Sequence, residues 1–305
     1  MSIVFFADAT ADIPAEYLKE HENVQILGMR YTIGDAEGIY TVADNQEQLD
    51  DFYKRMREGE KTSTSMILYE EAYQAFEPFF AKGCDIIYFG LLLELSAQHV
   101  QIEKAGNDLA EKYGRKFYAP NTKSITVKNY SIVRYAVEFE KKYADLPDCF
   151  ERVKAEIDPL FDNIVIYFTI GDLKYLHRSG RLSATRKLIG NLLNIKPIIH
   201  IDLEKAKLVP LAKKAGRLPS IQYIANLIKQ PRQNPEIWLL HADCPDDAEI
   251  LKQKVLEIDP DAKVIMKQIG VIVGLHGGPG TVGLGFVKKY LDKPDALLDV
   301  YRHGL

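Results

Sequence analysis

The sequence predicts a two-domain α/β protein. Short apolar runs alternate with helix-periodic segments through the first half, a pattern typical of right-handed βαβ crossovers and a parallel sheet. The periodicity stops around Ala144–Asp148, and a chain of 305 residues is long enough for two ordinary domains. We therefore predict an N-terminal domain at 1–147 with a mainly parallel, Rossmann-like sheet, and a C-terminal α/β domain at 148–305 with a mixed or antiparallel sheet.

The composition is that of a soluble globular protein. Hydrophobic residues make up 47% and charged residues 27%, and a net charge of −4 gives no reason to expect nucleic acid or more than transient membrane contact. The three cysteines are scattered, which argues against a disulfide framework or a metal site and for a reducing compartment. The N-terminus lacks a basic leader, and no apolar run reaches the ~18 residues of a membrane span, so we expect a cytoplasmic protein.

The elements of the first half follow from apolar runs and helix signals. Ile3–Phe6 and Val24–Ile33 are typical of strands, and polar residues follow the first of them at Asp8–Asp12. Asp44 and Glu47 have the spacing of a capping box that opens a helix to Glu58. The remaining expected elements are a polar loop at Thr62–Ser65, helices at Tyr69–Lys82, Ala97–Lys112 and Val127–Lys141, and strands at Cys84–Phe89 and Lys116–Ala119. Ligands of such sheets collect at the carboxyl ends of the strands.

The second half is expected to mix strands of both directions. A hairpin is predicted where Asp202–Lys205 joins two apolar runs. The expected elements are strands at Asn163–Thr169, Ile195–Ile201, Ala206–Val209, Ile237–Leu240 and Lys263–Gln268, and helices ending at Gly180, starting near Ser183, and at Leu218–Lys229 and Asp246–Ile258.

A glycine-rich stretch at 269–286 closes this series. Seven of its eighteen residues are glycine, and we interpret it as an apolar strand, a break at His276–Gly280 and a second apolar segment. Consecutive amides in the break can form a nest for an anion, with His276 at its lip. A tight turn between two buried strands explains the same residues equally well.

Two other groups of residues could carry chemistry. The hydroxyl run Thr62–Ser65 could hold a carboxyl group in a dry site, or could be a solvated loop that caps the next helix. Arg178 and Arg181 could bind a phosphate or carboxylate, or could be surface charges at a helix end. No set of nucleophile, base and orienting residue is apparent, and no phosphate-binding P-loop is present in the sequence.

Five short sequence motifs occur in a defined order over nearly the whole chain. They are Asp8–Pro14 with the pattern Asp-x-Thr-x-Asp-x-Pro, the hydroxyl run Thr62–Ser65, Leu173–Leu182 with its Gly-Arg-Leu end, Leu192–Ile198 with Lys-Pro, and Gly274–Gly280 with His-Gly-Gly-Pro-Gly. Together they resemble motifs of the DegV family of bacterial fatty-acid-binding proteins.

The resemblance implies a carrier rather than an enzyme. Such a carrier buries one long-chain fatty acid between its two domains, needs no cofactor, and presents the carboxyl group to a fatty-acid kinase subunit that forms an acyl phosphate. The residues that it implies are Thr62, Ser63, Ser96, His276, Gly277 and Gly278 around the carboxyl group, and Arg178 and Arg181 on the phosphate or partner side.

This chain departs from the family pattern in the expected head-group region. Leu92 and Leu93 stand where the family has hydroxyl residues, and Ser96 remains. We therefore expect His276, Thr62 or Lys61 to contribute more of the head-group binding. The alternative is a phosphate-handling enzyme that uses His276–Gly280 as an anion nest and His276 as acid or base.

Overall fold

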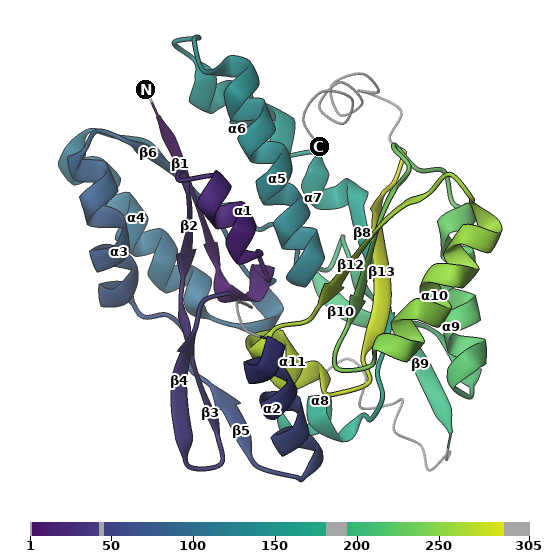
Figure 1. The fold of residues 1–305 in the computed structure, drawn as a ribbon. Helices are drawn as coiled ribbons and strands as arrows, with labels where there is room; N and C mark the ends of the chain where they lie inside the picture. Colours follow the sequence, from purple (N-terminus) through teal and green to yellow (C-terminus); the bar gives the residue numbers. More distant parts are fainter. Residues whose placement is uncertain (1, 43–45, 181–193, 290–305) are drawn as a thin grey trace.

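The computed structural model describes residues 2–42, 46–180 and 194–289 and confirms the predicted α/β class. Sheet A is wholly parallel, with the strand order β2-β1-β6-β7. Its strands are β1 (Ile3–Asp8), β2 (Val24–Leu27), β6 (Asp85–Phe89) and β7 (Phe117–Tyr118). Helices α3 (Tyr69–Ala81) and α4 (Gln98–Tyr113) lie on its outer side, and α1 (Ala15–Glu20) and α5 (Thr126–Tyr143) on the side toward the second half (Figure 1).

Sheet C is mixed, as expected for the second half, with the order β10-β9-β8-β13-β11-β12. Only the β11–β12 pair is parallel among its described pairs. The strands are β8 (Ile164–Thr169), β9 (Ile195–Asp202), β10 (Lys207–Ala215), β11 (Glu236–His241), β12 (Lys263–Gln268) and β13 (Val282–Val287). Helices α9 (Arg217–Asn226) and α10 (Pro245–Ile258) cover its outer face (Figure 1), and the 3-10 turn η4 (Leu227–Lys229) extends α9.

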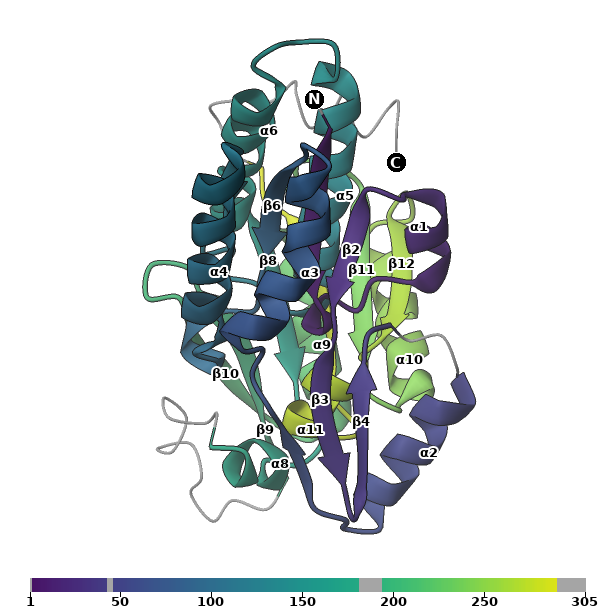
Figure 2. The ribbon, with the colours of Figure 1, turned by 90° about the vertical axis from the view of Figure 1, so that its left-hand side faces the viewer.

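A small antiparallel sheet B, with the order β4-β3-β5, extends beyond sheet A toward two short helices (Figure 2). Its strands are β3 (Met29–Ile33), β4 (Ala36–Tyr40) and β5 (Thr62–Thr64); the helices are α8 (Lys174–Arg178) and α11 (Val271–Gly277), with α2 (Gln46–Arg57) beside them. The remaining elements are α6 (Cys149–Ile157), α7 (Leu160–Asn163), and the 3-10 turns η1 (Ala9–Ala11) and η2 (Leu93–Leu95).

Three predictions of local structure are wrong. Val24–Ile33 is not one strand, because the chain leaves sheet A after Leu27 and enters sheet B at Met29. The hydroxyl run is not a loop, because Thr62–Thr64 pairs with Tyr31–Ile33 as strand β5. The run from Val271 is helix α11 rather than a strand, although the apolar segment after the glycines is strand β13 as expected. The helix predicted from Ser183 lies outside the described residues.

The main hydrophobic core is continuous from sheet A to the inner face of sheet C. Phe5 and Phe89 of sheet A belong to the same buried cluster as Trp238 and Leu240 of β11. A second, smaller cluster lies between sheet C and helices α9 and α10. The division of the chain after residue 147 stays a prediction.

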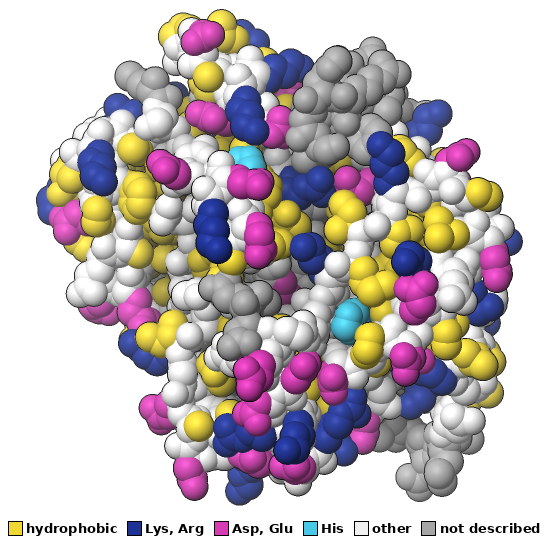
Figure 3. All heavy atoms as spheres, in the orientation of Figure 1, with side chains coloured by type: hydrophobic (Ala, Val, Ile, Leu, Met, Phe, Trp, Pro, Cys, Tyr) yellow, Lys and Arg dark blue, Asp and Glu magenta, His cyan; other side chains and the backbone are white. Residues whose placement is uncertain are grey.

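Charges of both signs share the surface. On the face drawn in Figure 3, Lys and Arg side chains alternate with Asp and Glu over the described elements, and hydrophobic side chains show between them. Among the described helices none is both long and apolar enough to cross a bilayer.

Candidate functional site

A cavity of about 590 Å³ lies between the carboxyl end of sheet A and the inner face of sheet C. Most of its wall is apolar, and no lysine or arginine belongs to the described wall. The apolar lining residues are Met29, Met66, Leu91, Leu93, Leu95, Ala97, Ile125, Ile166, Phe168, Leu176, Leu208, Leu240, Ala242, Ile269, Ile272 and Val273. The polar ones are Thr10, Thr64, Ser65, Glu94, Ser96, Thr126, His276 and Thr281.

Strand alternation explains why sheet C contributes apolar side chains to this cavity. Successive residues of a strand point to opposite faces. In β8, Ile166 and Phe168 line the cavity, whereas Val165 and Tyr167 belong to the outer cluster beneath α9 and α10. The inner face of sheet C thus forms one apolar wall.

A buried carboxylate shapes the opposite wall. Asp8, at the end of β1, accepts hydrogen bonds from the Thr10 amide at 3.0 Å and from the Thr10 hydroxyl. It also accepts from Tyr88 Oη at 2.9 Å, the Leu91 amide at 2.9 Å and Gln98 Nε2 at 2.7 Å. Burial, with Asp8 next to it, raises the pKa of Tyr88 well above its usual value, so the phenol stays a donor. Asp8 therefore ties together the loops that bound the cavity.

The polar end of the cavity is formed by α11 and β5. His276 lies in the last turn of α11, and its Nε2 is 3.2 Å from Thr64 Oγ1, within hydrogen-bonding distance. Gly277 and Thr281 line the cavity next to it, and the Thr281 hydroxyl donates to the carbonyls of Gly277 and Gly278 at 3.0 Å each. An imidazole and a hydroxyl thus lie side by side at this part of a mostly apolar cavity.

The amides that follow His276, which one interpretation of the sequence assigned to an anion nest, are hydrogen-bonded within the fold. The amides of Gly278 and Gly280 each donate to a backbone carbonyl at 2.7 Å, those of Gly274 and Ala242, and the Thr281 amide donates to Gly278 at 3.3 Å. Pro279 has no amide hydrogen to offer. The glycines serve close packing instead: Gly278 has φ +80°, and a Cβ there would lie 2.1 Å from the Tyr175 ring.

The other residues singled out from the sequence lie in different places. Ser96 and Gly277 line the cavity. Gly278, the next residue in the sequence after Gly277, does not belong to the lining. From the hydroxyl run, Thr64 and Ser65 face the cavity; Ser63 is exposed and hydrogen-bonds Thr32 at 2.8 Å. Leu92 is fully buried behind the wall, whereas Leu93 lines it.

A second, smaller hollow of about 270 Å³ adjoins the polar end. Its lining residues are Lys61, Thr62, Tyr175, Arg178, Ser179 and Leu275. Thr62 is two residues before Thr64 on β5, and Leu275 directly precedes His276, so the two hollows share these elements. Arg178 donates to the Glu60 carbonyl at 3.5 Å, and Arg181 lies outside the described residues.

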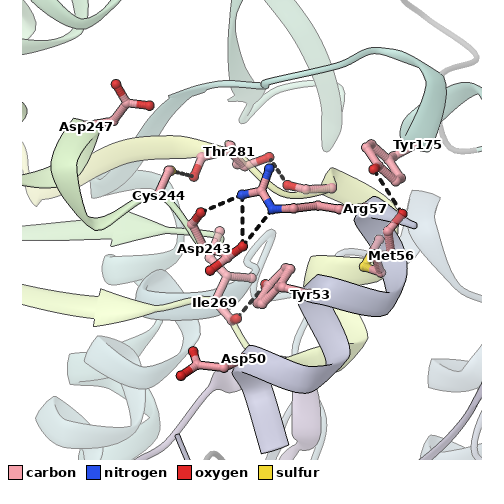
Figure 4. Close-up of polar contacts among 12 residues, drawn as sticks. Asp50, Tyr53, Met56, Arg57, Tyr175, Asp243, Cys244, Asp247, Ile269 and Thr281 are labelled. Atoms are coloured by element: carbon pink, nitrogen blue, oxygen red, sulfur yellow. Dashed lines mark hydrogen bonds and ion pairs between the residues drawn. The ribbon is translucent and has the colours of Figure 1, made fainter. Parts of the chain in front are cut away.

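Helix α2 fastens this region to the second half of the chain (Figure 4). Tyr53 Oη donates to the Ile269 carbonyl at 2.7 Å, and Tyr175 Oη donates to the Met56 carbonyl at 3.3 Å. Arg57 donates to the Asp243 carboxylate at 2.9 Å and to its carbonyl at 2.8 Å. Elements from both halves therefore fix the position of α11.

A further buried acid supports α11 at its start. Asp12 Oδ1 accepts from the Gly270 amide at 3.1 Å, and Asp12 Oδ2 has no hydrogen-bond partner among the described residues. Burial is the main cause that raises the pKa of Asp12 well above its usual value, and the nearby Asp8 adds to this. Burial therefore disfavours the charged form of Asp12, whose role in the structure is to hold the start of α11.

Several cavity residues were not singled out from the sequence. The sequence indicates Thr64 only as part of the hydroxyl run, and Thr10 only as part of the polar segment at the carboxyl end of the first strand. It does not single out Thr126 or Thr281 as ligand-binding residues. Recognition of β5 as a strand would have put Thr62 and Thr64 on the same face, because residues two apart in a strand point to the same side. Nothing in the sequence marks Thr126, because its place at the cavity depends on how α5 packs against β8.

These features define the class of protein as far as the described residues show it: an α/β protein with a large, mostly apolar cavity between sheets A and C. A sequence model of a protein family, described as uncharacterised protein of the DegV family, matches residues 2–289 of this chain. The chain belongs to the DegV family, as its motifs indicated.

Relatives and solved structures agree with this assignment. A DegV domain-containing protein of Clostridium perfringens is 29% identical over 288 residues, which cover 93% of this chain and 97% of that protein. The structure of a fatty-acid-binding DegV family protein from Thermus thermophilus matches with a TM-score of 0.82 at 20% identity, covering 95% of this chain and 100% of that one. The structure of a fatty-acid-binding DegV family protein from Streptococcus agalactiae matches with a TM-score of 0.79 at 22% identity, and the match again covers 95% of this chain and 100% of that one.

Proposed function

We propose that this protein is a cytoplasmic carrier that buries one long-chain fatty acid in the cavity between sheets A and C. The observation that carries the proposal is the cavity itself, about 590 Å³ with an apolar wall and a polar end. Ligand pockets of about 300–1,000 Å³ are typical of small-molecule binding. The fatty-acid-binding relatives with the same fold support this choice of ligand.

The apolar wall accounts for affinity. Each buried CH₂ group contributes about 0.8 kcal/mol, so an acyl chain of ~16 carbons contributes on the order of 10 kcal/mol before the costs of association. The head group then needs only a few hydrogen bonds to fix its position. The proposal assigns this chain no catalytic residue and no cofactor.

We place the carboxyl group at the His276 end. His276 and Thr64 offer donors there, and Ser65 and Ser96 line the same cavity. Thr62, Ser63 and Gly278 do not line the cavity themselves. They remain proposed ligand-binding residues because they are close in sequence to Thr64 and Gly277, which do. The amides of the glycine loop are already bonded to carbonyls, so the phosphate-handling alternative loses the feature that suggested it.

We further propose that the carrier presents the carboxyl group to a fatty-acid kinase subunit. Lys61 and Arg178 line the hollow next to the His276 end, and neither forms an ion pair with an acidic side chain of the described residues. Such cations could balance the charge of a phosphoryl group as it is transferred to the carboxylate. Arg178→Ala should then leave fatty-acid affinity unchanged and slow acyl phosphate formation when a kinase subunit and ATP are supplied.

The carrier proposal is tested by native mass spectrometry of protein purified from bacteria, followed by titration. We expect a mass excess equal to one fatty acid. After delipidation, His276→Ala should bind a fluorescent fatty acid about 1.5–3 kcal/mol more weakly than wild type near neutral pH, the range of a hydrogen bond to a charged group. An apo mass together with no binding by the delipidated protein contradicts the carrier; unchanged binding by His276→Ala contradicts the head-group assignment alone.

A further inference from the structure

Thr126, the first residue of α5, has an unusual backbone for its residue type. Its φ is +47°, in the left-handed region that β-branched residues avoid because of steric clash. The residue is 1% exposed and lines the main cavity next to Ile125. Backbone strain of this kind persists where the surrounding structure imposes it, and it gathers at ligand sites.

The side chain of Thr126 is also incompletely satisfied. Its Oγ1 is buried and has no hydrogen-bond partner within the described parts of the chain. The other threonines of the inner wall differ, because the Thr10 hydroxyl donates to Asp8 and that of Thr281 donates to two carbonyls. A hydroxyl buried without a partner costs free energy, and a ligand group that bonds to it recovers that cost.

Thr126 is separate from the proposed head-group end. The turn η1 contacts α5, and Asp12, directly after η1, accepts from the Gly270 amide at the start of α11. His276 lies at the other end of α11, in its last turn. Helix α5 also contacts β8, whose Ile166 and Phe168 form the facing apolar wall. A ligand with its carboxyl group near His276 would therefore bring a part of its chain, not its head, past Thr126.

We propose that Thr126 is a second polar subsite and that the preferred ligand is a fatty acid with a neutral oxygen function, a hydroxyl or an oxo group, within its acyl chain. This inference rests on the proposed carrier function. The oxygen function is neutral because Thr126 has no cation beside it: the described cavity wall contains no lysine or arginine, and its one carboxylate is Glu94. An anion there would be buried without compensation.

The experiment compares octadecanoic acid with hydroxyoctadecanoic acids whose hydroxyl lies near the carboxyl, in the middle of the chain, or near the methyl end. Each is titrated into delipidated wild type, Thr126→Val and Thr126→Ser, with Ile125→Val as a matched control for the shape of the neighbouring wall. We expect wild type to bind the mid-chain hydroxy acid about five- to tenfold more tightly than octadecanoic acid, the size of one neutral hydrogen bond. Thr126→Val should abolish this preference, Thr126→Ser should keep it, and Ile125→Val should shift both acids alike.

The outcomes separate this inference from the function on which it rests. If wild type binds none of the acids, the carrier function fails. If wild type binds them without preference, or if Thr126→Val weakens octadecanoic acid as much as the mid-chain hydroxy acid, the subsite is refuted and the hydroxyl serves the carboxyl group or the fold instead. Thermal melts of each variant show whether it is folded, and Thr126→Ser keeps the test valid if Thr126→Val does not fold.

Discussion

Lys128 offers a test of the energetics of this fold that does not depend on any ligand. It lies in the first turns of α5, is 1% exposed, and its Nζ donates to the Phe161 carbonyl at 2.9 Å. Burial is the main cause that lowers the pKa of Lys128 from 10.5 to about 7; nearby Asp162 opposes this and nearby Lys123 adds to it. A buried lysine of this kind should destabilise the folded protein.

The size of the effect follows from linkage. Since a pKa difference of one corresponds to 1.36 kcal/mol, lowering the pKa from 10.5 to about 7 costs about 5 kcal/mol of the free energy of unfolding at neutral pH, as an upper bound. Lys128→Met removes the charge and keeps an unbranched chain of similar length. It also loses the hydrogen bond to Phe161, worth about 1 kcal/mol, so we expect a net stabilisation of about 2–4 kcal/mol near pH 7.

The pH dependence gives the sharper test. Between about pH 7 and pH 10.5 the unfolded chain holds a proton on Lys128 that the folded chain has lost, so this contribution to stability rises with pH. The advantage of Lys128→Met over wild type should therefore shrink from about pH 7 to about pH 9.5. Urea unfolding followed by circular dichroism measures the difference in stability between the two proteins and its change with pH. Lys141→Met is the control, because Lys141 lies on the same helix but its side chain is 54% exposed. A variant less stable than wild type near neutral pH, or an advantage independent of pH, would refute the reasoning.

Two further predictions concern residues around the cavity. Leu92→Ser should lower the free energy of unfolding by about 2–4 kcal/mol, because it removes a fully buried side chain rather than adding a ligand-binding hydroxyl; a variant with unchanged urea midpoint and tighter fatty-acid binding would contradict this. Asp12→Asn should match wild type at about pH 4 and become the more stable protein toward pH 7, because a raised carboxyl pKa contributes stability that is lost as pH rises. Equal urea midpoints of the two proteins at both pH values would contradict a raised pKa of the Asp12 carboxyl group.

The alternation of strands and helices could be predicted from the sequence because it depends on local periodicity. The hairpin of β9 and β10 and the buried strand β6 follow from runs of neighbouring residues alone. The apolar, β-branched run at Val271–Val273 has the same strand-like composition, yet it is helical in α11. The glycine in this run serves packing, because a Cβ at Gly274 would lie 2.2 Å from the Tyr53 hydroxyl, and only a glycine lets α11 approach α2 so closely.

The candidate site was harder to predict because its residues meet only through tertiary structure. His276 was found because it stands out in a glycine-rich stretch, but its partner Thr64 lies 212 positions away in the sequence. The hydroxyl run pointed to the right segment, but which of its side chains face the cavity depends on the pairing of β5 with β3. Thr126 carries no local signal, since its strained φ and unsatisfied hydroxyl exist only in the folded chain.

The motif residues that indicate the family need not be the residues that touch the ligand. Asp8 belongs to the opening motif, yet its carboxylate is used entirely by protein donors from η1, β6, the loop after β6 and α4. Asp12, from the same motif, supports the start of α11 through Gly270. These two acids hold the Thr10 wall and the His276 helix in place around the cavity. Neither acid belongs to the residues that line the cavity, so both act on a ligand only through the frame that they stabilise.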